Sequence, residues 1–207
     1  YVLTNAEVSG TLVQPLKSAS PSLRNVDEKM VKDAQEAYKQ ATSVTEATAN
    51  WLIVGDDRPG NTAQYVVYNL QSGQFLQPGN GDAPATMSET PVKIQISRRG
   101  IGFSLSNTTG KRSPLVAHPT APEGQELTGK GTLGAAWRIF ENLYLQPKAA
   151  LVKALRDYLK TGKFVVPTGI GSLHSAADAS ANPNDASAAL FDLSGRRITT
   201  PTAGQVV

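Results

Sequence analysis

The sequence contains no cysteine, and it has only two histidines among its 207 residues. Without cysteine, these residues can form no disulfide, no thiolate zinc site and no cysteine nucleophile. The two histidines, His118 and His174, each stand in a loop-like stretch without a second ligand at metal-binding spacing. We therefore predict no metal site and no cofactor. The absence of cysteine leaves the cellular compartment open, because many exported proteins lack it.

Long apolar runs and long basic stripes are absent as well. No run approaches the ~20 residues that a membrane-spanning helix needs, so no membrane span is expected. The formal net charge is +3, and the basic residues are scattered, the densest groups being pairs such as Arg98-Arg99 and Arg196-Arg197. A nucleic-acid-binding face usually needs a longer basic stripe, so no nucleic acid partner is expected. Because the chain starts at Tyr1 and not at methionine, we expect a mature form or a fragment without its signal peptide.

Two segments have the apolar spacing of amphipathic helices. The first covers about 25–43, where Asn25 and Glu28 have the spacing of a capping box. Its apolar stripe consists of Met30, Val31, Ala34, Ala37, Tyr38 and Ala41. The second covers about 147–161, with Pro147 in its first turn and Gly162 just past its end. The buried face of the second helix is predicted to consist of Leu151, Val152, Leu155, Tyr158 and Leu159.

Between 51 and 140 the apolar period becomes that of short strands. Strands are predicted at 51–54, 64–70, 74–76, 92–97, 102–106 and 135–140, with one or two more within 1–24 and a short one at 164–167. Short strands at a spacing of about ten residues, separated by turn signals, favour an antiparallel barrel or sandwich over a parallel sheet.

One stretch of this region resembles a known type of domain. The sequence YVVYNLQSGQFL (65–76) is similar to the "YLYNVGTGKYL" unit of exported Bacteroidetes proteins, where it opens a lectin-like, β-rich domain related to the ricin-type β-trefoil. The similarity continues through SETPVKIQI (88–96) and GFSLS (102–106) to AAWRIF (135–140). The chain departs from the pattern where Ala135-Ala136-Trp137 replaces the Gln-x-Trp of sugar-binding repeats. Only about half of the strands of a three-repeat trefoil can be counted.

The end of the chain carries a second resemblance. LFDLSGRRITTPTAGQVV (190–207) is similar to the "YDLSGRR" signature near the C-terminus of proteins exported by Bacteroidetes such as Prevotella and Bacteroides. In longer forms, that segment is associated with type IX secretion. Here it stops before the final strand of the signature, so we interpret it as a truncated β motif with a hairpin around Ser194-Gly195. The resemblance implies a secreted or cell-surface protein.

Together these patterns predict an α+β fold. An antiparallel β-rich central domain, partly trefoil- or barrel-like, should carry two amphipathic helices packed on it. The main domain is expected at 1–167, a linker of few large apolar residues at 168–189, and the truncated C-terminal β motif at 190–207. The linker composition is typical of mobile connecting segments.

No catalytic set emerges from the sequence. A Ser-His-Asp triad would need serine on a constrained turn, and no G-x-S-x-G occurs. Asp56 and Asp57 follow a strand where catalytic acids often lie, but adjacent residues of a strand point to opposite faces. A turn of the Asx type leading into Pro59-Gly60 is the favoured interpretation. No catalytic residue is predicted.

Candidate ligand-binding residues are Asp56 and Asp57, together with aromatic rings that could stack on a sugar: Trp51, Tyr68 and Trp137. The competing interpretation places Trp51 and Trp137 in the core. Tyr65 and Tyr68 should lie on opposite faces of their strand, which would leave at least one of them on the outer face.

The leading hypothesis is a non-catalytic, secreted or cell-surface binding module of a Bacteroidetes-like bacterium, with a carbohydrate or a protein as its ligand. Two alternatives stay open: a hydrolase of glycan or peptide that uses loop carboxylates, and a structural spacer or propeptide-like domain. The oligomeric state does not follow from the sequence.

Overall fold

A computed structural model of the chain describes residues 1–8, 10–15, 18–26, 29–56, 58, 63–109, 113–117, 127, 133–142, 147–167, 190–191 and 197–198. The chain divides into two compact units, Tyr1–His174 and Ser175–Val207. The predicted linker, 168–189, lies outside the described residues. In the described part of the chain, no helix is long and apolar enough to span a bilayer.

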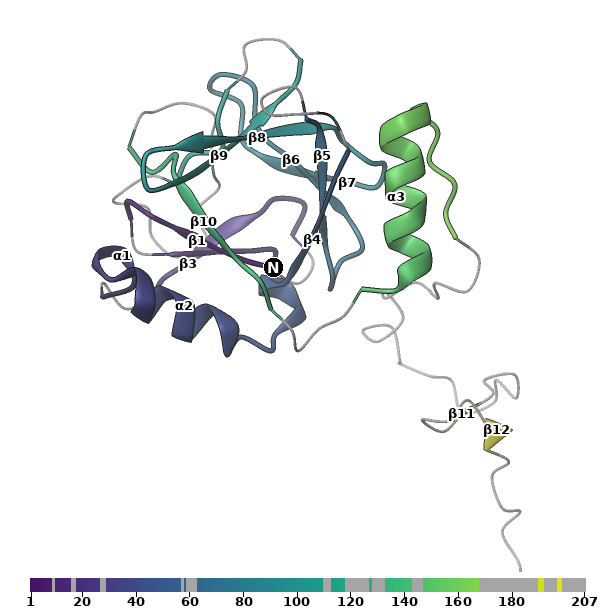
Figure 1. The fold of residues 1–207 in the computed structure, drawn as a ribbon, viewed down its shortest axis with the longest axis horizontal. Coiled ribbons are helices and arrows are strands. Elements are labelled where there is room, and N and C mark those ends of the chain that lie inside the picture. The colour runs from purple at the N-terminus through teal and green to yellow at the C-terminus, as the bar shows by residue number, and fades with distance from the viewer. Residues whose placement is uncertain are drawn as a thin grey trace, which may run out of the picture. The chain divides into compact units, whose positions relative to one another are not determined.

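The first unit has the predicted α+β class, with ten antiparallel strands and helices packed against them (Figure 1). The strands are β1 (Val2–Asn5), β2 (Thr11–Val13), β3 (Ser22–Arg24), β4 (Trp51–Gly55), β5 (Tyr65–Asn69), β6 (Phe75–Gln77), β7 (Thr86–Ser88), β8 (Ile94–Arg99), β9 (Gly102–Asn107) and β10 (Trp137–Phe140). The helices are α1 (Lys29–Lys32), α2 (Ala34–Thr42), a short 3-10 helix (Ala47–Ala49) and α3 (Ala149–Thr161).

The strands follow the order β3-β2-β1-β10-β9-β8-β5-β6-β7, and β4 pairs with β5 beside this path. The sheet is open, since no ladder of the described residues joins β4 to β1. The residue just before β1, Tyr1, meets the first residue of β4: Trp51 N donates to Tyr1 O and Tyr1 N donates to Trp51 O, both at 2.8 Å. The antiparallel β-rich domain is as predicted, and its sheet is open and not a closed barrel.

The same arrangement of two antiparallel strands occurs three times in this sheet, in β1 with β10, in β4 with β5 and in β8 with β9. In each copy a buried asparagine ends one strand and lies opposite a large apolar residue of its partner strand: Asn5 opposite Trp137, Asn69 opposite Trp51 and Asn107 opposite Ile94. Neighbouring copies touch at single positions, Trp137 with Phe103 and Ile94 with Tyr65. The Tyr1–Trp51 contact is the third junction of this kind.

Asn69 and Asn5 each fasten the turn that follows their strand. Asn69 Oδ1 accepts hydrogen bonds from Gln71 N and Ser72 N, both at 3.0 Å, and Asn69 Nδ2 donates to Thr48 O at 2.9 Å. Asn5 repeats the pattern, accepting from Glu7 N and Val8 N and donating to Gly134 O. Because buried amides are costly unless they are hydrogen-bonded, these side chains specify the turn geometry.

The two tryptophans lie in the core inside the sheet, and neither is exposed to solvent. Trp51 Nε1 donates to Leu12 O at 3.0 Å, and Trp137 Nε1 donates to Leu115 O at 2.9 Å. Both indoles thus make the hydrogen bond that a buried indole requires. Their core placement agrees with one of the two interpretations drawn from the sequence.

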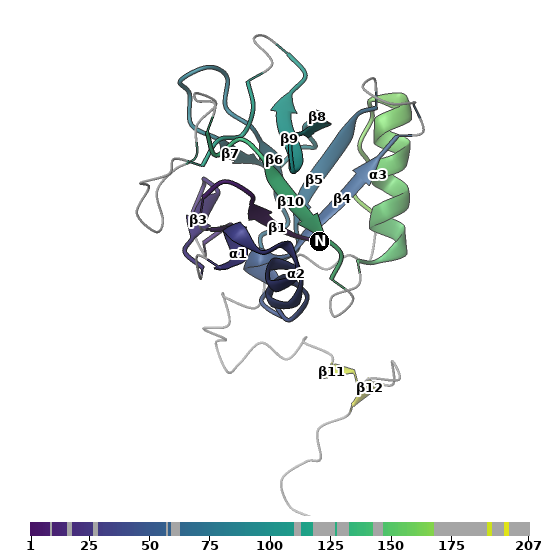
Figure 2. The same cartoon turned by 60° about the vertical axis from the view of Figure 1, so that its left-hand side comes forward.

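A second apolar cluster lies between the outer face of β4 and β5 and the helix α3, which runs beside these strands in both views (Figures 1 and 2). Leu151, Leu155 and Leu159 of α3 are buried there, as the spacing predicts. Gly162 ends the helix with a φ of 74°, a conformation that glycine adopts at little cost. Tyr65 and Tyr68 lie on opposite faces of β5, as predicted, and α3 covers the outer face so that Tyr68 is only 7% exposed.

The first predicted helix differs from the structure in its extent. The described part of 25–43 contains not one helix but two, α1 and α2, separated by Asp33. Asp33 has an extended backbone, and its carboxylate accepts hydrogen bonds from Gln35 N and Glu36 N. Aspartate is a strong N-cap residue, so it starts a new helix in the middle of the apolar stripe. Of that stripe, Ala37 and Ala41 are buried, whereas Tyr38 is 56% exposed.

Two smaller predictions concern the end of the chain. Residues 164–167 form no strand, since Phe164 packs on Phe75 while Val165 and Val166 stay exposed. In the second unit, β11 (Leu190–Phe191) pairs antiparallel with β12 (Arg197–Ile198), which confirms the predicted pairing. Residues 192–196, which contain the predicted turn and Arg196, lie outside the described residues.

We predict that Asn69→Ala lowers the free energy of unfolding by about 2–4 kcal/mol, because one acceptor and one donor are lost in a buried site. Denaturant unfolding of the purified chain measures this change. Asn80→Ala is the matched control: Asn80 is exposed, and its replacement should stay within about 0.5 kcal/mol. Equal effects of the two substitutions would contradict the role given to Asn69.

We also predict an alkaline loss of stability that depends on Tyr68. Burial raises the pKa of Tyr68 above its ordinary value of 10.0. Well below pH 10 the phenol is neutral in both states and stability is fully present; as the pH approaches and passes 10, the unfolded state ionises first and stability falls. In thermal unfolding across this range, Tyr68→Phe should show a shallower decline than wild type, whereas Tyr38→Phe, at an exposed position, should not.

Candidate functional site

A groove of about 680 Å³ lies at one side of the sheet. Its walls come from the segment between β6 and β7 with the adjoining strand ends, the residues just before β8, the end of β9 with the residues after it, and the helix α3. Residues of four separate segments meet there: Gln77, Pro78, Gly79, Asn80, Ala83, Pro84, Thr86, Pro91, Val92, Lys93, Asn107, Thr108, Thr109 and Tyr158. We refer to this cavity as the polar groove.

The loop that forms one wall is tightly folded. A Cβ on Gly79 would lie 1.9 Å from Ala83 O, so only glycine fits at this position. Asn80 O accepts from Ala83 N at 3.3 Å, and Gly81 N donates to Ser113 Oγ at 2.8 Å. Three prolines, Pro78, Pro84 and Pro91, restrict the backbone around the groove further. These constraints give the groove a defined wall before any ligand binds.

The groove lies where α3 changes the repeated asparagine arrangement. By analogy with Thr48 and Gly134, the carbonyl acceptor for Asn107 would be Pro91 O, three positions before Ile94. That oxygen instead accepts from the Tyr158 hydroxyl of α3 at 2.8 Å. Asn107 Nδ2 turns to Gly79 O at the long distance of 3.4 Å. In this third strand pair, α3 thus occupies the carbonyl oxygen that would otherwise accept from the asparagine.

Polar side chains of the groove differ in how far they are engaged. Thr108 Oγ1 donates to Lys93 O at 3.1 Å. Gln77, Asn80, Thr86 and Thr109 line the groove without a side-chain hydrogen bond in the described part of the chain. Burial raises the pKa of Tyr158 above its ordinary value, so its hydroxyl stays a donor. None of the described lining residues is acidic.

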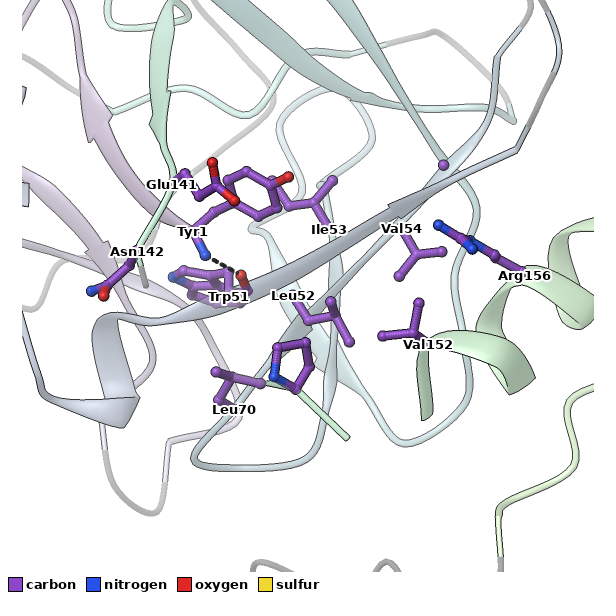
Figure 3. A pocket seen from close by; sticks show the side chains of 12 residues that line it. Tyr1, Trp51, Leu52, Ile53, Val54, Leu70, Glu141, Asn142, Val152 and Arg156 are labelled. Atoms are coloured by element: carbon purple, nitrogen blue, oxygen red, sulfur yellow. Dashed lines mark hydrogen bonds between the residues drawn. The ribbon is translucent and has the colours of Figure 1, made fainter. Parts of the chain in front are cut away.

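A second, smaller pocket of about 230 Å³ follows the edge of β4 (Figure 3). Ile53 and Gly55 belong to it, as do Val152 and Arg156 of α3. Leu70 N donates to Asn50 O and Asp56 N to Gln64 O, so the even-numbered residues of β4 bond to β5. The backbone N–H and C=O groups of the odd-numbered residues of β4 therefore point away from β5. Among these, Trp51 pairs with Tyr1, and no described strand continues the pairing along Ile53 and Gly55.

The four described candidate residues of the sequence, Trp51, Asp56, Tyr68 and Trp137, do not form one site. Trp51 and Trp137 have no exposed ring face, and Tyr68 is enclosed by α3. A ring without an exposed face cannot stack on a sugar in this structure. Asp57 lies outside the described residues, as do both histidines, His118 and His174.

Asp56 forms the turn that the sequence favoured. Its carboxylate accepts from Arg58 N at 3.2 Å and from Gln64 N at 3.1 Å, and it pairs with the Arg58 guanidinium at 2.5 Å. Although partial burial acts to raise the pKa of Asp56, the hydrogen bonds to Arg58 and Gln64 outweigh it and hold the pKa below the ordinary value. Asp56 lines neither cavity, and no group of three potential metal ligands occurs within the described ranges.

No local sequence signal marks the groove residues that matter most. Asn80 comes from a Gly- and Pro-rich loop, which the sequence pattern identifies only as a turn. Lys93 comes from the start of the predicted strand 92–97, which the pattern identifies only as half-buried. The one available hint was the density of Gly, Pro and Asn after 76, since binding residues often lie on loops held by a rigid scaffold.

Comparison with known proteins identifies no family for the chain. No family model matches the chain, and no curated protein matches it. Among solved structures, the Rhizoctonia solani agglutinin is similar, with a TM-score of 0.49 and 14% sequence identity, over 69% of this chain and 94% of the agglutinin chain. At this distance the similarity does not transfer the agglutinin's properties to this chain.

Proposed function

We propose that the chain is a non-catalytic binding module whose polar groove holds a carbohydrate. The observation that carries this proposal is the set of four unengaged polar side chains along one concavity: Gln77, Asn80, Thr86 and Thr109. Amide and hydroxyl groups both donate and accept hydrogen bonds, which suits the hydroxyls of a sugar. The volume of about 680 Å³ is in the range of small-ligand sites.

The shape of the site favours a small ligand over a folded protein partner. Stable protein interfaces bury about 800 Å² on each side and are centred on exposed aromatic or arginine residues. The groove is concave, and its aromatic residue, Tyr158, is already bonded to Pro91 O. The groove therefore favours a small ligand, and a protein ligand is the alternative for the same site.

Hydrolysis receives no support from the groove. Glycosidases need two carboxyl groups on either side of the scissile bond. The described lining of the groove contains none, and the Asp56 carboxylate is bonded to Arg58. A structural spacer would need no groove with unengaged polar groups, so that alternative is the weaker one.

The location of the module is a separate proposal. We propose a secreted or cell-surface protein of a Bacteroidetes-like bacterium, on the basis of the "YDLSGRR"-type segment at 190–207 alone. Fractionation of a producing cell with an antibody to the first unit would decide it. Accumulation in the cytoplasm would overturn it without affecting the binding proposal.

The binding proposal is tested with the full chain on an array of neutral and acidic glycans. We predict binding that falls roughly tenfold or more in Gln77→Ala/Asn80→Ala, because two hydrogen bonds of about 1 kcal/mol each are lost. Gln35→Ala removes an exposed amide from α2, outside the groove, and should leave binding unchanged. Absence of any bound glycan, or equal loss in both variants, would overturn the proposal.

A further inference from the structure

Lys93 places a positive charge in the polar groove. Its Nζ donates to Leu159 O at 3.4 Å and lies 5.3 Å from the centre of the Tyr158 ring. An ammonium group has three donors, and the long bond to Leu159 O occupies one of them. Among the described residues no carboxylate pairs with Lys93. The ammonium therefore keeps donors for a bound group.

The protein holds this ammonium in place from two sides. Thr108 Oγ1 bonds to the Lys93 carbonyl, which fixes the start of β8. On the other side, the Tyr158 hydroxyl bonds to Pro91 O, which fixes the ring over which Nζ lies. The Leu159 carbonyl belongs to the last turn of α3, where the helix dipole favours a cation. A lysine held in this way loses less side-chain entropy when it binds an anion.

The charge of the groove has no internal counterpart. Every other described lining residue is neutral, and the four unengaged polar side chains line the same cavity as Lys93. An anionic oxygen would meet the ammonium in a charge-assisted hydrogen bond, which is about twice as strong as a neutral one. The hydroxyls of the same ligand would remain for the amides and threonines.

We propose that the groove selects saccharides that carry an anionic group, a carboxylate or a sulfate, and that Lys93 is the residue that selects them. This proposal rests on the proposed function, since it names the ligand class of the same site. Lys93 contacts the anionic oxygens, while Asn80 and Thr109 contact neutral hydroxyls. Selectivity and overall binding are thus assigned to different side chains.

The test measures binding of the full chain to two matched pairs of polymers: dextran sulfate with dextran, and polygalacturonate with its methyl ester. The expected result is preference for the charged member of at least one pair. The pair in which preference appears identifies sulfate or carboxylate as the anionic group. Lys93→Gln should then reduce affinity for the charged polymer about tenfold and leave affinity for neutral glycans unchanged.

Lys163→Gln is the control for general electrostatic attraction. Lys163 is exposed just beyond α3, does not line the groove, and loses the same charge on substitution. Equal weakening by the two substitutions would show attraction by net charge alone and would overturn the proposal. Lys93→Arg keeps the charge and should keep the preference, which separates loss of charge from disturbed folding. Thermal unfolding of each variant verifies the fold.

The outcomes separate this inference from the proposed function. Binding that depends on Asn80 but shows no preference within either pair would leave the proposed function standing and overturn the role of Lys93. No binding to any array glycan or to any of the four polymers would overturn both.

Discussion

Three buried asparagines hold the first unit together. Each ends a strand, faces a large apolar residue of the partner strand, and binds backbone groups that no strand can reach. A buried amide that satisfies only part of its hydrogen-bonding capacity costs more than an apolar residue would, so this arrangement is stable only if the turn geometry is correct. Asn5 and Asn69 meet this condition with good distances.

The third asparagine shows what α3 contributes. In the copy that contains Asn107, the expected carbonyl partner is taken by Tyr158. Asn107 Nδ2 makes a long bond to Gly79 O, while Asn107 Oδ1 accepts from Ser113 N at 2.9 Å. The helix therefore has two roles. It covers the outer face of β4 and β5. In addition, Tyr158 in its C-terminal half takes the carbonyl acceptor in one of the three strand pairs that contain a buried asparagine. The polar groove lies where the third strand pair differs from the other two, and the polar side chains without hydrogen bonds line this groove.

Much of the fold could be predicted from the sequence because its signals are local. The alternation in 92–97 predicted a half-buried strand, and the spacing of Leu151, Leu155 and Leu159 predicted the buried face of α3. The helix break at Asp33 was missed because the apolar stripe continues across it. The break comes from the Asp33 carboxylate, which caps the start of α2. The asparagine repeat was missed because Asn5, Asn69 and Asn107 are far apart and their surroundings share little sequence.

The site could not be predicted for a related reason. Its walls come from four segments, and none of them has a pattern that belongs to a binding site. The sequence directed attention to aromatic rings and to Asp56, which are the most conspicuous residues of the strand region. The structure assigns the rings to the two cores and Asp56 to a turn, since large apolar groups gain most from burial and a carboxylate next to arginine pairs with it.

The single contact between Tyr1 and Trp51 has a practical consequence. Their reciprocal hydrogen bonds make the first residue the start of an antiparallel pairing with β4, and the next outward-facing positions along β4 are Ile53 and Gly55. Any residues placed ahead of Tyr1 are therefore directed along the edge of β4, into the smaller pocket. An affinity tag at that end would start in the smaller pocket beside β4 and not in the polar groove, which Tyr1 does not line.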